Sequence, residues 1–151
     1  MAKRNIFRGL AAVLALGMCM TGLAGCGSEK RADGKTEIEV VSYKPEAVKA
    51  FEKIEKRFNE THDDIHLTIS SPNEAMTILK TRFIREDYPD IIAIGGDINY
   101  SNFLDADLFE DISGLDEVQT VKQAYLDMDK ELEFIPKDGT YALPYVANAA
   151  G

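Results

Sequence analysis

The sequence has few of the residues that enzymes and nucleic-acid-binding proteins commonly use. It holds two His and two Cys, and it contains neither a Gly-x-Ser-x-Gly motif nor a phosphate-binding loop. These absences argue against a nucleophilic enzyme, a nucleotide site and a His/Cys metal cluster, and we expect no cofactor. Basic residues number 17 against 26 acidic ones, so we also exclude nucleic acid as a partner.

Long apolar runs are missing as well. A membrane-spanning helix needs about 20 consecutive apolar residues, and the apolar stretch at residues 10–20 is shorter. It follows the basic residues Lys3, Arg4 and Arg8 and leads through small residues to Cys26. This order is typical of a secretory signal, although an uncleaved anchor stays open as an alternative.

The segment Leu23-Ala24-Gly25-Cys26 resembles the lipobox of bacterial lipoproteins. The resemblance implies that residues 1–25 are a signal peptide and that Cys26 carries a diacylglyceryl thioether as the first mature residue. The expected location is the extracytoplasmic face of the cell membrane, with a lipid anchor. Because Cys19 would leave with the signal, no thiol remains for a disulfide.

The remaining chain has the size of one domain. From Cys26 onward it carries 14 basic and 26 acidic residues, a net charge of −12. Residues 26–36 are polar without apolar periodicity, which is typical of a flexible tether. We therefore expect the folded domain to cover residues 37–151.

Apolar periodicity in this domain predicts strands alternating with helices. The expected strands cover residues 37–42, 65–69 and 91–94, and the continuous apolar run of the third suits a strand covered on both faces. A helix should begin at Pro45, and the Ser71-Pro72-Asn73-Glu74 capping box should begin another that ends before Pro89. The pattern is that of an α/β fold with a mostly parallel sheet and helices on its faces.

The last third of the chain has weaker signals. We expect short turns and one-turn helices over residues 98–115, one amphipathic helix over 118–135, and an extended segment over 141–147. Asp127 and Asp129 then lie on a solvated helix face and not in a calcium loop.

Three polar loops follow the predicted strands, at residues 42–44, 70–73 and 95–97. Because the carboxyl ends of parallel strands meet at one edge of a sheet, we expect these loops to form a polar cleft.

Two segments carry a family resemblance: "YPDIIAIGGD" at 88–97 and "GTYALPYVANAAG" at 139–151. With the first strand and helix, they resemble the sugar-binding, family 1 type of extracellular solute-binding lipoproteins of bacterial ABC importers. The resemblance implies a type II periplasmic-binding-protein-like fold with two lobes, of which residues 37–151 are the N-terminal one. It also implies a sugar or other small solute and ABC permease subunits as partners, and no enzymatic activity.

Five positions are candidate ligand-binding residues. The resemblance assigns sugar hydroxyl contacts to Asp97 and Asn148, and aromatic stacking to Tyr43 and Tyr145; Ser71 is a candidate from the second loop. Four of them have a structural alternative: helix cap for Asp97 and Ser71, packing for Tyr145, turn residue for Asn148. Two further functions stay open: a lipid-anchored glycan hydrolase and a lipoprotein that presents solutes to a sensor. Because the second lobe is absent from this sequence, we expect the chain alone to bind sugar poorly.

His62 and His66 have the four-residue spacing of a helical metal site, and Asn59 begins a glycosylation sequon. We expect the first His to end a helix and the second to lie in a strand, so the metal interpretation is not favoured.

Overall fold

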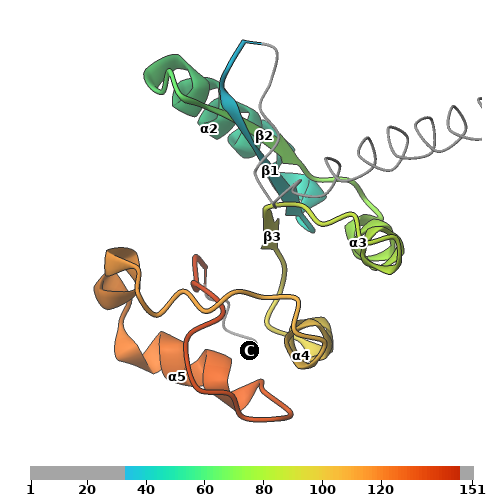
Figure 1. The fold of residues 1–151 in the computed structure, drawn as a ribbon, viewed down its shortest axis with the longest axis vertical. Helices are drawn as coiled ribbons and strands as arrows, with labels where there is room; N and C mark the ends of the chain where they lie inside the picture. Colours follow the sequence, from blue (N-terminus) through green and yellow to red (C-terminus); the bar gives the residue numbers. More distant parts are fainter. Residues whose placement is uncertain (1–32, 147–151) are drawn as a thin grey trace, which may run out of the picture.

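The computed structural model describes residues 33–146 of the chain. In this part a three-stranded parallel sheet has the strand order β2-β1-β3 (Figure 1). Cys26, Asn148 and the predicted signal and tether up to residue 32 lie outside the described residues.

The sheet confirms the three expected strands. β1 (Thr36–Ser42) lies between β2 (Ile65–Ser70) and β3 (Ile91–Ala93). Thr36 aligns with Ile65, and Val40 with both Ile69 and Ile91. Strand β1 thus begins at Thr36, one residue before the expected domain boundary. The expectation of a third strand covered on both faces is wrong for Ile91, which is 51% exposed.

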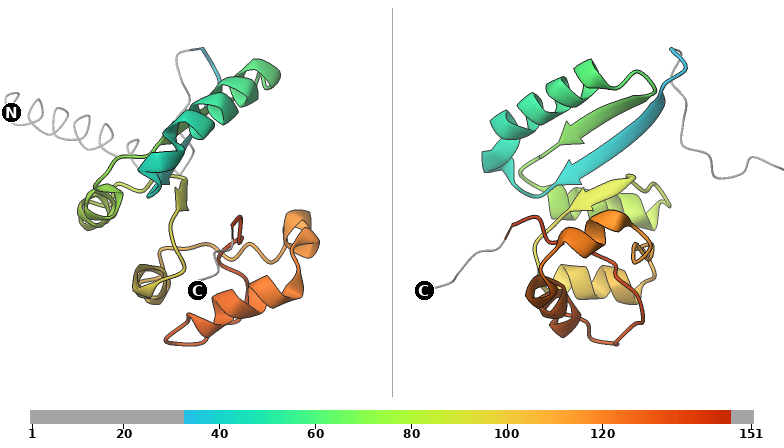
Figure 2. Two further views of the ribbon diagram at one scale, coloured as in Figure 1. Left: turned by 180° about the vertical axis from the view of Figure 1, so that it is seen from behind. Right: turned by 90° about the vertical axis from the view of Figure 1, so that its left-hand side faces the viewer.

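The two α-helices that connect the strands lie on opposite faces of the sheet (Figures 1 and 2). The 3₁₀ helix η1 (Pro45–Ala47) leads into α2 (Val48–Thr61), and α3 (Ala75–Ile84) connects β2 with β3. One crossover moves outward from β1 to β2 and the next returns past β1 to β3. Since both are parallel connections of the same hand, this reversal places the two helices on opposite faces.

The capping box does not begin α3 as expected. The helix starts at Ala75, its N-cap is Glu74, and no side chain caps it. The Ser71 hydroxyl instead donates a hydrogen bond to the carbonyl oxygen of Ser42, at 3.2 Å. Ser71 therefore links the ends of β2 and β1, and its predicted role as a cap is wrong.

The last third differs from the expected pattern in two respects. Residues 98–115 contain the two-turn helix α4 (Ile98–Asp105), and the predicted helix over 118–135 is divided into η2 (Asp116–Thr120) and α5 (Gln123–Glu131). The backbone is extended at Val121. The apolar stripe is not one buried face, because Val118 is 4% exposed whereas Met128 is 56% exposed. Residues 141–146 form no strand.

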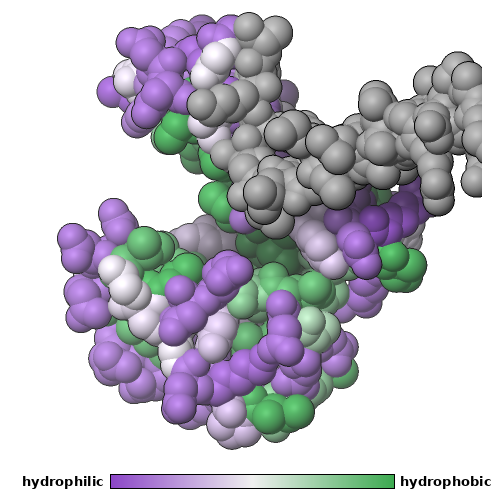
Figure 3. Space-filling view, viewed as in Figure 1, coloured by the Kyte–Doolittle hydropathy of each residue, from purple (hydrophilic) through white to green (hydrophobic). Residues whose placement is uncertain are grey.

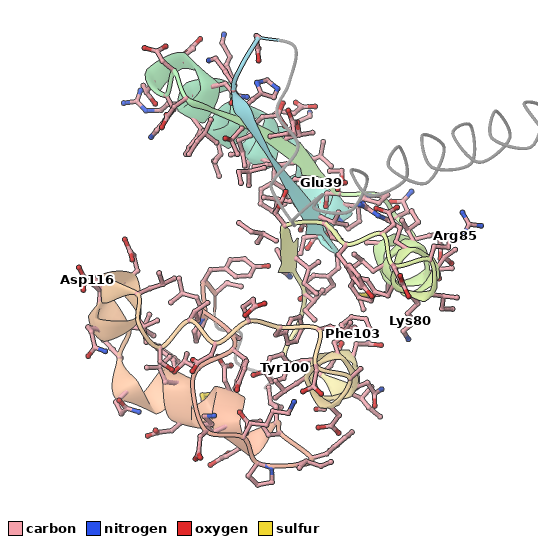
Figure 4. All side chains as sticks on the ribbon, viewed as in Figure 1. Glu39, Lys80, Arg85, Tyr100, Phe103 and Asp116 are labelled. Atoms are coloured by element: carbon pink, nitrogen blue, oxygen red, sulfur yellow. The ribbon has the colours of Figure 1, made fainter. Side chains whose placement is uncertain are left out.

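Aromatic side chains join α3 to α4 in the core. The rings of Phe83 and Phe103 meet edge to face with centroids 5.0 Å apart, and Tyr100 stacks on Phe109 at 5.7 Å. Figure 4 shows Phe103 on the side of α4 toward α3, and Tyr100 on the side toward α5. Leu79 in α3 and Leu104 in α4 are fully buried. This packing fixes α4 directly after β3 and so positions the polar loop between them.

Candidate functional site

The three strand-end loops meet at one edge of the sheet, as expected. The backbone N–H of Tyr43 donates to the Ala93 carbonyl at 3.0 Å, which joins the first loop to the end of β3. The Ser71–Ser42 bond joins the second loop to the first. Backbone and side-chain bonds thus connect all three loops.

A groove of about 1550 Å³ opens beside this edge, between β3, α5 and the segment 141–146. Tyr43, Asp97 and Tyr145 line it, from three separate parts of the chain. Apolar residues such as Ile92 and Met128 contribute most of the remaining wall. Figure 3 shows this hollow, with hydrophobic residues on the parts of the molecule that border it. A mostly apolar groove with a few polar groups is typical of a small-molecule site.

Two aromatic candidates, Tyr43 and Tyr145, lie near one cation. The ammonium group of Lys44 is 4.7 Å from the centroid of the Tyr43 ring. Partial burial raises the pKa of Tyr145, Tyr43 raises it further, and Lys44 opposes the rise. The pKa of Lys44 is raised, first by its hydrogen bond with Tyr43. The two tyrosines and Lys44 therefore form one cluster, which we call the Tyr43 cluster.

The position of Tyr43 depends on a residue without a side chain. A Cβ atom at Gly95 would lie 3.1 Å from the Tyr43 hydroxyl and 3.3 Å from its Cζ. These distances are tighter than ordinary van der Waals contacts, so a larger residue at Gly95 would move the ring. The loop after β3 thus allows the Tyr43 ring to lie against it.

Asp97 is the N-cap of α4. Its carboxylate accepts from the backbone N–H of Asn99 at 2.8 Å and from the Asn99 side-chain amide at 2.9 Å. Asp97 therefore caps the helix, which was the structural alternative to ligand binding. A carboxylate has two oxygens and about four lone-pair sites, and both bonds use Oδ1. Asp97 is exposed in the groove wall, so Oδ2 remains available for a ligand hydroxyl.

Ser71 is the other candidate among the described residues. Ser71 is not among the groove-lining residues, although it lies at the same sheet edge, and its ligand contact stays a prediction. Asn148 lies outside the described residues. Two groove residues that the sequence did not reveal are Tyr88 and Tyr125. Both are exposed aromatics. Tyr88 begins the family-resembling segment 88–97 and Tyr125 lies on the predicted amphipathic helix, but neither pattern marked its tyrosine as a ligand-binding residue.

The histidine expectation is confirmed: His62 is the C-cap of α2, and His66 lies in β2. Within residues 33–146, no group of three or more His, Cys, Asp or Glu side chains could hold a metal ion. The helices in that part of the chain are too short or too polar to cross a membrane.

One expectation about α5 is wrong. Asp129 is half-buried and not part of a solvated face, and desolvation raises its pKa to about 6.

Comparison with known families decides the assignment. The family of bacterial extracellular solute-binding proteins matches residues 37–151, which is most of the chain and all of its expected domain. The chain belongs to this family.

Relatives of this solute-binding protein have names that refer to sugars. The multiple sugar-binding protein of Streptococcus mutans is 28% identical over 140 residues, which are 90% of this chain and 32% of the relative. The chain therefore spans about a third of that relative's length. The family description and this name both denote binding proteins and not enzymes.

Solved structures of RafE confirm the fold. The apo form from Streptococcus pneumoniae matches with a TM-score of 0.56 and 29% identity over 68% of this chain and 25% of RafE. The complex of RafE with raffinose matches with the same TM-score and 30% identity, over 62% of this chain and 24% of RafE. The mixed α/β architecture with a parallel sheet is thus that of a periplasmic-binding-protein-like fold, which was the expectation from the sequence.

Proposed function

We propose that this chain is part of the substrate-binding component of an ABC importer, which captures a sugar or oligosaccharide outside the cell for a membrane permease. The observation that carries the proposal is the convergence of Tyr43, Asp97 and Tyr145 on one groove at the carboxyl edge of a parallel sheet. Ligands of open α/β sheets bind at this edge. The sugar-binding relative and the raffinose complex of RafE support the choice of ligand class.

The groove has the chemistry that a sugar requires. Aromatic rings can cover the apolar C–H face of a pyranose, and the Tyr43 cluster offers two such rings beside a cation. Asp97 would accept a hydroxyl hydrogen bond through the carboxylate oxygen that its cap does not use. No bond is broken in this mechanism, so binding and release complete the cycle.

Release to a permease requires a change that the transporter can recognise. In the proposed mechanism, a second lobe closes over the solute, and the closed state is the form that docks. Lipid on Cys26 would keep the protein at the extracytoplasmic membrane face, close to its permease. This chain matches about a third of the length of the sugar-binding relative, and we predict that the chain alone binds sugar poorly.

Two substitutions distinguish the helix-capping role of Asp97 from its proposed contact with the ligand. Ser is as good an N-cap as Asp, so Asp97→Ser should leave thermal stability nearly unchanged, whereas Asp97→Ala should lower it. Both should weaken binding of raffinose or a related oligosaccharide by about tenfold to a hundredfold, because a buried hydroxyl loses its charged acceptor. Calorimetry on the longest chain that the reading frame provides measures the affinity.

Asp116→Ser is the matched control, since Asp116 lies on η2 (Figure 4) and does not line the groove. The affinity of the Asp116→Ser variant for the oligosaccharide should equal that of the parent chain. If Asp97→Ser binds the oligosaccharide as well as the parent does, Asp97 is only a cap. If Tyr43→Ala also leaves affinity unchanged, the groove is not the sugar site.

A further inference from the structure

A second cavity lies beneath the groove, between α4, α5 and the chain at residues 113–121 and 140–142. Its volume is about 420 Å³, which is in the range of small-molecule sites. Tyr100, Asp129 and Tyr141 line both this cavity and the groove, so the two spaces adjoin. Nothing in the proposed sugar contacts uses this cavity.

One carboxylate in the cavity wall already has its partners. Glu133, whose side chain is 2% exposed, lies 2.8 Å from the Lys130 ammonium and accepts from the backbone N–H of Lys137 at 2.9 Å. Lys130 also donates to the Lys137 carbonyl at 2.7 Å and lies over the Tyr141 ring at 5.7 Å. This acid and this base therefore neutralise each other.

The other carboxylate has one oxygen without a hydrogen-bond partner in the described residues. Asp129 Oδ2 is shielded from solvent and has no hydrogen-bond partner among residues 33–146. Asp129, Lys130 and Glu133 are the charged residues of the wall, so their formal charges add to −1. An ionised carboxylate that is withdrawn from water without a donor is costly. The cavity therefore lacks one positive, hydrogen-donating group.

We propose that this cavity binds a small primary ammonium compound, with Asp129 as its counter-ion. An ammonium group supplies both the missing charge and N–H donors, and rotation about the soft terminal torsion of Asp129 turns either oxygen toward it. The side chains of Tyr100 and Tyr141 line the same cavity. A neutral hydroxyl would leave the charge uncompensated, and the wall lacks the three acidic or imidazole ligands of a metal site in the described residues.

The proposal predicts a distinct dependence on pH. The titratable residues that line the cavity with Asp129 are Tyr100 from α4, Lys130 from α5, Glu133 from the turn after α5, and Tyr141 from the final segment. The pKa of Tyr100 is raised to about 12, first by burial and then by the charges of Asp129 and Glu133, so Tyr100 stays neutral at ordinary pH. With the Asp129 pKa at about 6, affinity for an ammonium ion should be constant above that pH. It should fall about tenfold for each pH unit below it, since the protonated acid carries no charge.

The experiment compares ethanolammonium chloride with its neutral analogue ethylene glycol and with sodium chloride at equal ionic strength. Amide signals of Gln123, Thr140 and Tyr141 are followed by NMR in the full chain between about pH 7 and 8. We expect saturable shifts with ethanolammonium alone. Equal shifts with ethylene glycol, or no saturable shift with ethanolammonium, would overturn the proposal, and the cavity would then be a water site only.

Two variants separate the site from the fold. Asp129→Asn keeps the shape and removes the charge, so the ethanolammonium response should disappear while thermal stability is maintained or rises. Asp127→Asn on the same helix retains an acceptor for the Gln123 amide, and its response should match that of the parent chain. Retention of the response in Asp129→Asn would contradict the proposed counter-ion.

Discussion

Asn59 in α2 forms two hydrogen bonds with Leu67 in β2. Its side-chain amide donates to the Leu67 carbonyl at 2.8 Å, and its side-chain oxygen accepts from the Leu67 N–H at 2.8 Å. Two residues farther along the strand, the Ile69 N–H donates to Glu55 of the same helix at 2.7 Å. The helix thus supplies the partners that a neighbouring strand would give to the outer edge of β2, which protects that edge from pairing with another chain.

Asn59→Ala should lower the free energy of unfolding by about 1–3 kcal/mol, because it leaves two part-buried backbone groups of Leu67 unpaired. Urea unfolding measures the change. Asn102→Ala on the exposed side of α4 is the control and should stay within about 0.5 kcal/mol of the parent. A similar loss in both variants would show that the Asn59 pair contributes little.

Arg82 connects α3 with β1. Its guanidinium bonds both carboxylate oxygens of Glu39 at 2.7 Å, and it also bonds Asp87. Arg82→Lys keeps the charge but loses this two-point geometry, so we expect a loss of about 1–2 kcal/mol in unfolding free energy. The exposed Arg85 provides the comparison, since Arg85→Lys should be neutral. Equal stability of the two variants would contradict a role for bidentate geometry.

Asp111 makes the chain sensitive to acid. Hydrogen bonds from the Ser113 side chain and from the Thr140 and Ser113 backbones lower its pKa from 3.8 to about 2. Because the folded state holds this acid in its charged form, its stabilising contribution is fully present above the unfolded pKa and is lost as the pH falls toward about 2. Asp111→Asn should therefore lose less stability than the parent chain between about pH 4 and 2. Parallel acid profiles in urea unfolding would contradict this assignment.

Gly139 lies against the same carboxylate. Its φ is +103°, and a Cβ atom there would lie 2.6 Å from Asp111 Cγ. Gly139→Ala should therefore destabilise the chain by more than about 1 kcal/mol, through both backbone strain and the clash. Gly114→Ala is the matched control, because no atom lies within 4 Å of its Cβ position. Thermal unfolding compares the two, and an unchanged midpoint for Gly139→Ala would contradict the expected strain.

The lipid prediction concerns Cys26, which lies outside the described residues. Cys26→Ser should abolish labelling by a fatty-acid analogue and release the protein from membranes, because hydroxyl oxygen does not replace the thiolate as a nucleophile. Cys19→Ser should leave labelling intact, since that residue belongs to the predicted signal. Labelled Cys26→Ser protein would contradict the anchor.

Local sequence patterns were sufficient to predict the parallel sheet and the edge of it at which a ligand would bind. Short apolar segments, separated by the helix that Pro45 begins and by the one before Pro89, predicted three parallel strands. Parallel connection then required their carboxyl ends to meet, and the bond from Tyr43 to Ala93 confirms that they do. These features depend on chain periodicity and handedness, which residues near in sequence determine.

Tertiary packing determined several features that the apolar periodicity did not predict. The spacing from Val118 to Ile135 fitted a helix, yet the backbone is extended at Val121, and Val118 is buried whereas Met128 is exposed. The Ser71 hydroxyl could either cap α3 or donate to the end of β1. In the folded chain it donates to the carbonyl oxygen of Ser42 in the neighbouring strand. The half-burial of Asp129 likewise depends on α4 and the final segment, which lie far from it in sequence. Burial and hydrogen-bond competition are set by distant neighbours, so they emerge only when the chain is folded.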